Sequence, residues 1–220
     1  MFKEFKNQVL DNSLDAEQLF QKYFVDSNTY YFEQVEKNRD LEYMLKTDLA
    51  RVLKLHANDI YFIGSAKTGF SIKPSAFGRP YDGKYLDTKI FQDRSDIDIA
   101  IVSSKLFDLI QENVYDWTDG YKQSWDSNYY YRTGSGKFKV ELKYMFLEYM
   151  GKGWYRPDLA PKGFSIETDE GALKDVTDQW KKRLKRKISF AIYKNWNFFK
   201  KYQLESVKRI KLEIETGEIL

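Results

Sequence analysis

The sequence predicts a single α+β domain in which helices flank a small β-sheet. Three short segments rich in β-branched and aromatic residues have the length of strands: 59–63, 96–102 and 188–193. Longer segments with apolar residues at helical spacing separate them. The 220 residues suit one domain, and no repeat or linker divides them. We therefore expect one domain over 1–220, with a core over about 40–115 and the late strand 187–193.

Composition excludes several classes of protein. A hydrophobic fraction of 42% with a net charge of +3 excludes wholesale disorder. The absence of cysteine excludes a disulfide framework and a thiolate metal site, and a single histidine, His56, excludes a three-histidine zinc centre. No segment reaches the roughly 18 apolar residues of a membrane span, and residues 1–13 do not resemble a secretory signal. We expect a cytoplasmic protein that does not contact membranes.

The first half of the chain alternates between helical and strand patterns. Residues 15–24 and 40–56 carry apolar stripes at helical spacing, and His56 lies where the second stripe ends. Residues 59–63 predict a buried strand. Residues 70–94 have no clean period and predict a long loop, and a loop of this length inside a compact domain is most often functional or mobile.

The segment 96–102 alternates strictly, so Ile97, Ile99 and Ile101 point to one face of a strand and Asp96 and Asp98 to the other. A serine that follows, at 103 or 104, can cap the next helix.

The second half contains one ambiguous segment. Residues 138–150 alternate like a strand but also fit a helix, and their length favours the helix. The later patterns predict a helix over 170–186, a strand over 188–193 and a closing helix over 195–212. Between them, residues 181–187 hold six cations in seven positions, which indicates either a solvated helix face or a patch that binds phosphates.

Two pairs of residues suggest chemistry. Asp96 and Asp98 lie on one face of a strand, roughly 6.5–7 Å apart along it. Such a pair indicates a bound cation, a shared proton or a polar solvated edge, and if a cation is bound, hard oxygen ligands favour Mg²⁺ or Mn²⁺. Gly64 and Ser65 form a strand-to-helix junction whose N–H groups can receive a phosphate, and Lys67 adds a cation nearby. The alternatives are a polar edge strand, an ordinary helix start and a solvated lysine.

These motifs resemble a known superfamily. The segments IGS at 63–65 and RSDIDIAI at 94–101 are similar to the nucleotidyltransferases that include DNA polymerase β and the minimal bacterial enzymes. The segments GSAKTGFS at 64–71 and RPD at 156–158 resemble a group of uncharacterised bacterial single-domain members. The resemblance implies a small mixed β-sheet flanked by helices. It also implies that Asp96 and Asp98 hold the catalytic metal, while Gly64 and Ser65, and with them Lys67, bind a nucleoside triphosphate.

The resemblance also implies a third catalytic carboxylate on a neighbouring strand. Glu141, within Val140-Glu141-Leu142, fits that pattern if 138–146 is a strand, and is a surface acid if the segment is helical. The late strand at 188–193 has no acid.

The expected function is therefore transfer of an NMP from an NTP to a hydroxyl of RNA such as tRNA, of a protein or of a small molecule. The alternative is a degenerate module that binds a nucleotide or RNA. By analogy with small superfamily members, either activity could serve a toxin–antitoxin or antiviral defence system.

Overall fold

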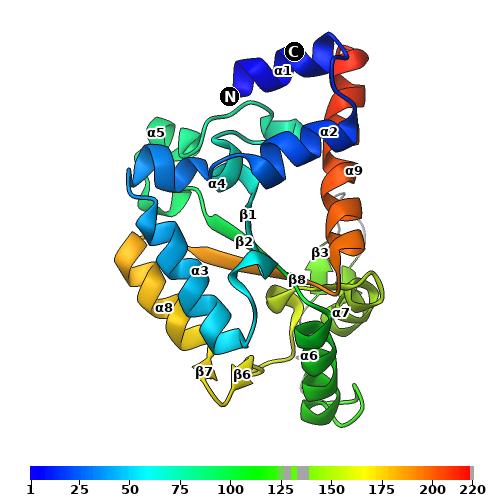
Figure 1. Ribbon diagram of the computed structural model, residues 1–220. Helices are drawn as coiled ribbons and strands as arrows, with labels where there is room; N and C mark the ends of the chain where they lie inside the picture. The colour runs from blue at the N-terminus through cyan, green and yellow to red at the C-terminus, as the bar shows by residue number, and fades with distance from the viewer. Residues whose placement is uncertain (124, 126–129, 133–138, 219–220) are drawn as a thin grey trace.

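The computed structural model describes all of the chain except residues 124, 126–129, 133–138 and 219–220. Helices hold 59% of the residues and strands 12%, so the fold mixes helix and sheet and is compatible with the predicted α+β class. Helices pack around a central sheet (Figure 1). Among the described residues, no helix combines the length and the apolar character needed to cross a membrane.

The helices and strands have the following bounds. The α-helices are α1 (Phe2–Leu10), α2 (Ala16–Phe20), α3 (Asp40–Leu53), α4 (Gly64–Thr68), α5 (Gly83–Thr88), α6 (Ser104–Trp117), α7 (Leu142–Gly151), α8 (Leu173–Leu184) and α9 (Trp196–Glu215). The strands are β1 (Ile60–Ile63), β2 (Ile97–Val102), β3 (Tyr130–Arg132), β4 (Lys139–Glu141), β5 (Trp154–Tyr155), β6 (Glu167–Thr168), β7 (Gly171–Ala172) and β8 (Ile188–Tyr193). Two π-helical segments are η1 (Gln21–Asp26) and η2 (Tyr31–Val35). Short 3₁₀ segments are η3 (Ala57–Asp59), η4 (Pro74–Ala76), η5 (Phe91–Asp93) and η6 (Pro157–Leu159).

The central sheet has four strands in the order β1-β2-β8-β5. β1 runs antiparallel to β2, β2 runs parallel to β8, and β8 runs antiparallel to the short β5. In this register Asp98 lies opposite Ile63 on one side and Ser189 on the other. The three strands predicted from the sequence are therefore neighbours in one mixed sheet.

The two faces of the sheet pack against different helices. Ile97, Ile99 and Ile101 are fully buried with apolar residues of α3, α6 and α8. On the opposite face, Ala100 and Ala191 lie in a second core formed with α1, α2 and α9. The alternation predicted for 96–102 is thus confirmed. The isoleucines pack into one core, and the face of β2 that carries Asp98 lies on the side of the other core.

One local prediction was wrong, and one ambiguous segment is resolved. Residues 70–94 were expected to be a loop, but they contain η4, α5 and η5, elements too short to leave a periodic pattern. Within 138–150, β4 ends at Glu141 and α7 begins at Leu142, so both readings hold in part; Phe138 lies outside the described residues. His56 caps η3 by accepting a hydrogen bond from the Asn58 N–H, close to its expected place at a helix end.

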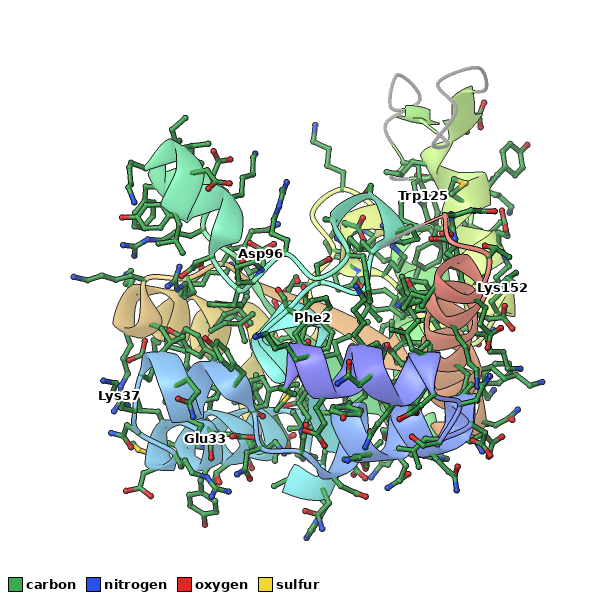
Figure 2. All side chains as sticks on the ribbon, turned by 90° about the horizontal axis from the view of Figure 1, so that it is seen from above. Phe2, Glu33, Lys37, Asp96, Trp125 and Lys152 are labelled. Carbon is green, nitrogen blue, oxygen red and sulfur yellow. The ribbon has the colours of Figure 1, made fainter. Side chains whose placement is uncertain are left out.

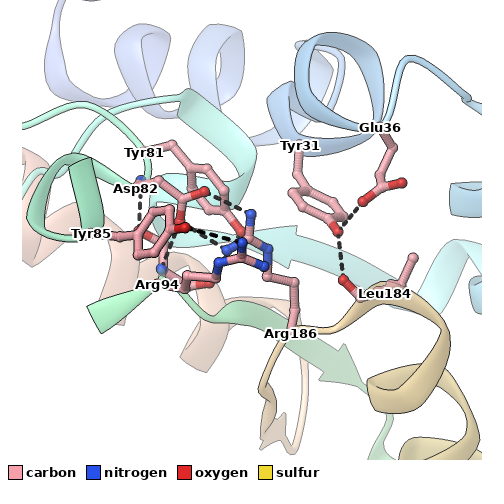
Figure 3. A network of polar contacts seen from close by, with 9 residues as sticks. Tyr31, Glu36, Tyr81, Asp82, Tyr85, Arg94, Leu184 and Arg186 are labelled. Carbon is pink, nitrogen blue, oxygen red and sulfur yellow. Dashed lines mark hydrogen bonds and ion pairs between the residues drawn. The ribbon is translucent and has the colours of Figure 1, made fainter. Parts of the chain in front are cut away.

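A largely buried ion pair joins the segment before β2 to the start of β8 (Figure 3). Arg186 donates to both carboxylate oxygens of Asp82 at 3.0 and 2.7 Å, and their side chains are 8% and 15% exposed. Asp82 in turn accepts from the Ser95 N–H at 2.8 Å. The guanidinium also lies over the rings of Tyr31 and Tyr81. Arg186 therefore has a structural role and is not part of a solvated face of the cationic run.

We predict that Arg186→Met lowers the free energy of unfolding by about 3 kcal/mol, because it leaves the Asp82 carboxylate buried without its cation. Urea unfolding measures this loss. The double variant Asp82→Asn/Arg186→Met should lose less than the single variant, since no uncompensated charge remains. An equal or larger loss in the double variant would contradict this account of the pair.

Candidate functional site

Gly64 lies directly against the carboxylate of Asp98. Gly64 has φ +63°, and a Cβ built there would stand 2.9 Å from Asp98 Oδ2. Both the backbone conformation and the close approach therefore require glycine. α4 begins at this residue, and the first N–H groups of a helix have no acceptors within the helix. The structure thus brings the predicted Gly64–Ser65 junction and Asp98 together.

Asp98 is a carboxylate in a partly apolar position. Burial raises its pKa, and the nearby charge of Asp96 raises it further. The Ser189 hydroxyl, across the β2–β8 pair, donates a hydrogen bond to Oδ1 and acts in the opposite direction, as do the charges of Lys73 and Lys187. A bound cation would stabilise the ionised form that burial disfavours.

Asp96 lies just before β2 and is more accessible than Asp98. Figure 2 shows it where the segment after α5 enters β2, well apart from Glu33, Lys37 and Trp125. Its carboxylate pairs with Lys187 Nζ at 2.8 Å, and the lysine side chain is 70% exposed. An exposed pair of this kind contributes about 0–1 kcal/mol, so a divalent cation can displace the lysine at little cost.

A cleft of about 870 Å³ opens beside these residues. Asp98, Ser189 and Ile63 contribute to its lining. Its cations are Lys73, Arg156, Lys174, Lys181 and Lys187, and its acids are Asp98 and Asp158. This excess of positive charge around a carboxylate suits a ligand that carries several negative charges and a metal ion.

The donor set fits a magnesium or manganese ion that shares its ligands with a substrate. Within the described residues, no group of three or more carboxylate, imidazole or thiolate side chains is arranged to hold a metal. Two carboxylates nevertheless suffice for Mg²⁺ in nucleotide sites, where phosphate oxygens and water complete the shell. Asp96 and Asp98 are the residues that would hold it.

Lys67 lies in a different place from the one expected. Its ammonium group donates to the carbonyl oxygens of Val25 and Ser27, at the end of η1, and its side chain is buried. It lines a second, smaller cavity with Glu42 and Lys46. It is not among the basic side chains that line the 870 Å³ cleft. The ammonium group of Lys67, which we expected to bind a phosphate, instead donates its hydrogen bonds to carbonyl oxygens at the end of a helix. We therefore leave Lys67 out of the site.

Glu141 is also separate from the site. It is exposed at the end of β4, which pairs with β3 in a small sheet outside the central one. The strand next to β2 is β8, and the residue opposite Asp98 on it is Ser189. The structure thus gives Glu141 no position as a third metal ligand.

Sequence reasoning missed Ser189 and Lys73 and assigned Lys187 only to a general cationic run. The strand containing Ser189 was predicted, but its parallel register with β2 joins positions 91 residues apart. Comparison with known protein families, with curated proteins and with solved structures gave no match.

We predict that burial of Lys67 makes stability depend on pH. Desolvation lowers its pKa to about 8, against about 10.4 in an unfolded chain. Between these values the unfolded state binds more protons, so stability rises with pH, and the cost of burying the charged lysine applies in full below the folded pKa.

The measurement is urea unfolding of the wild type and of Lys67→Met at neutral pH and near pH 10. Taking the difference cancels contributions from other groups. The wild type should gain on the variant by about 1–3 kcal/mol as the pH rises. A difference that is constant with pH would contradict the proposed burial of a charged amine.

Proposed function

We propose that the cleft binds a nucleoside triphosphate with Mg²⁺ or Mn²⁺ and that the protein is a nucleotidyltransferase. The observation that carries this proposal is the contact of Gly64, which directly follows β1, with Asp98 of the adjacent antiparallel strand β2, at a cleft with five cationic side chains. The mixed order β1-β2-β8 is compatible with the fold that the sequence resemblance implies.

The residues divide the work of binding by their chemistry. Asp96 and Asp98 hold the metal, which supplies charge neutralisation and in-line geometry at the reacting phosphate when it is bound. The N–H groups of the Gly64–Ser65 junction receive phosphate oxygens, because they have no partner in the helix. Lys73 and Lys187, whose charges already act on Asp98, are placed to pair with the rest of the triphosphate.

The reaction is a displacement at the α-phosphorus. An acceptor hydroxyl forms the new O–P bond and releases its proton to water, the bond to the β-phosphate oxygen breaks, and pyrophosphate leaves with the electron pair. Lysine side chains beside the leaving group stabilise its growing charge. The acceptor is a hydroxyl of RNA, of a protein or of a small molecule.

One observation favours a second candidate function, nucleotide binding without transfer. Ser189 occupies the strand position beside Asp98, and Glu141 lies in another sheet, so the described residues provide two carboxylates at the site. A serine hydroxyl cannot serve as a third anionic ligand or as an effective base at neutral pH. A sensor that holds a metal–nucleotide complex needs neither.

The deciding experiment incubates the protein with each α-³²P-labelled NTP, Mg²⁺ or Mn²⁺, and pooled tRNA with cell lysate. The test variant is Asp96→Asn/Asp98→Asn, and the matched control is Asp158→Asn, which removes another carboxylate of the same cleft. An asparagine at 98 can still accept from Ser189 and removes a buried charge, so we expect the double variant to unfold at a similar or higher temperature.

Metal-dependent labelling by the wild type and Asp158→Asn, with none by the double variant, would support transfer. Metal-dependent nucleotide binding that the double variant loses, without labelling, would support the second candidate. Undiminished labelling by a folded double variant would contradict both.

A further inference from the structure

The outer edge of β8 lacks a strand partner over half its length. β5 pairs with β8 only at Tyr193 and Ile192, so among the described residues 188–191 have β2 on one side and no strand on the other. These same residues line the 870 Å³ cleft. The open edge therefore borders this cleft.

The hydrogen bonds of the sheet show which backbone groups face outward. The carbonyls of Lys187 and Tyr193 accept from the β2 side, so alternate residues of β8 point toward β2. The N–H of Lys194 donates to the Gly153 carbonyl on the β5 side, so the residues of β8 that alternate with the first set point away from β2. By this alternation the N–H and C=O groups of Ile188 and Phe190 point outward, and no described residue forms a backbone hydrogen bond with them.

The end of β5 explains why the edge stays open. Pro157 has no N–H to donate and begins η6, so the chain turns away after Tyr155. An added strand would continue the line of β5 along β8. Natural sheets commonly protect such edges, and an edge left open inside a cleft is the arrangement that strand-adding peptides use.

The wall beside this edge is cationic. α8 presents Lys174, Thr177 and Lys181 to the cleft, at spacings of three and four residues that place them on one helix face. Arg156 and Lys187 line other parts of the cleft. The acids are Asp158, which pairs with Arg156, and Asp98, which belongs to the proposed metal site.

We propose that the open edge of β8 binds an extended, acidic peptide segment of a partner protein by adding it to the sheet as a strand. Backbone hydrogen bonds to Ile188 and Phe190 hold the segment, and alternate acidic side chains face Lys174 and Lys181 of α8. This docking surface lies in the same cleft as the proposed nucleotide site, but Lys174 and Lys181 are not among the residues assigned to the metal or to the phosphates, so the test is made without nucleotide.

The test uses a fluorescent, acetylated octapeptide of alternating Glu and Val, with anisotropy as the readout and without nucleotide or metal. Its counterpart of alternating Lys and Val tests charge. Two further versions, N-methylated at every Glu or at every Val, test backbone pairing, because one of them must block the amides that face the edge.

The protein variants form a matched pair. Lys174→Glu/Lys181→Glu reverses the charges that face the cleft, and Lys182→Glu/Lys185→Glu reverses two exposed lysines of the same cationic region that do not line it. We expect the acidic peptide to bind the wild type and the control alike, with affinity about tenfold lower for Lys174→Glu/Lys181→Glu. One N-methylated version should fail to bind.

Three outcomes would overturn the proposal. The lysine peptide could bind as well as the acidic one, or both N-methylated peptides could bind unchanged. In the third, oligouridylate binds with dependence on Lys174 and Lys181 while the acidic peptide does not bind, which would assign the surface to single-stranded nucleic acid.

Discussion

The buried pair of Arg186 and Asp82 is the constraint on which the geometry of the site depends. Asp82 belongs to the segment that precedes β2, and Arg186 is the second residue before β8. Arg186 donates two hydrogen bonds to Asp82, and the Ser95 N–H donates a third. These bonds hold the first residues of β2 and β8 side by side. Asp96 and Lys187 follow directly, and they meet because their strands are aligned by this contact.

The site that results has an electrostatic imbalance characteristic of ligand binding. Gly64 allows backbone to approach the Asp98 carboxylate, while burial raises the pKa of that carboxyl. Lys73 and Lys187 offset this effect only by their charge at a distance or through an exposed pair. Such an arrangement favours binding of a cation together with a polyphosphate. The cation would meet the carboxylate and the phosphates would meet the lysines, so each ligand charge would find an opposite charge already in place.

Patterns with a strong period predicted the fold well. The alternation at 96–102 gave the correct faces of β2, and the strand at 188–193 and the long closing helix were confirmed as β8 and α9. The contact between Gly64 and Asp98 also agrees with the predicted pairing of their motifs. The strands and helices depend on local sequence, where periodicity is informative, whereas the Gly64–Asp98 contact was expected only because the two motifs were interpreted together as one site.

Features that depend on distant segments could not be predicted. Lys67 turns toward carbonyls at the end of a π-helical segment, and no sequence pattern indicated that segment. Glu141 matched an apolar–acid–apolar pattern, but β4 pairs outside the central sheet. The role of Arg186 was hidden in a run of cations, because its partner Asp82 lies 104 residues away in what was expected to be a loop.

The most direct test of the account is a crystal structure with Mn²⁺ and a non-hydrolysable NTP analogue, read from the anomalous signal of manganese. We predict a manganese peak coordinated by Asp96 and Asp98 and by phosphate oxygens, with Lys187 released from Asp96 and the phosphates beside Gly64. Ordered nucleotide elsewhere, or manganese bound without either aspartate, would contradict it.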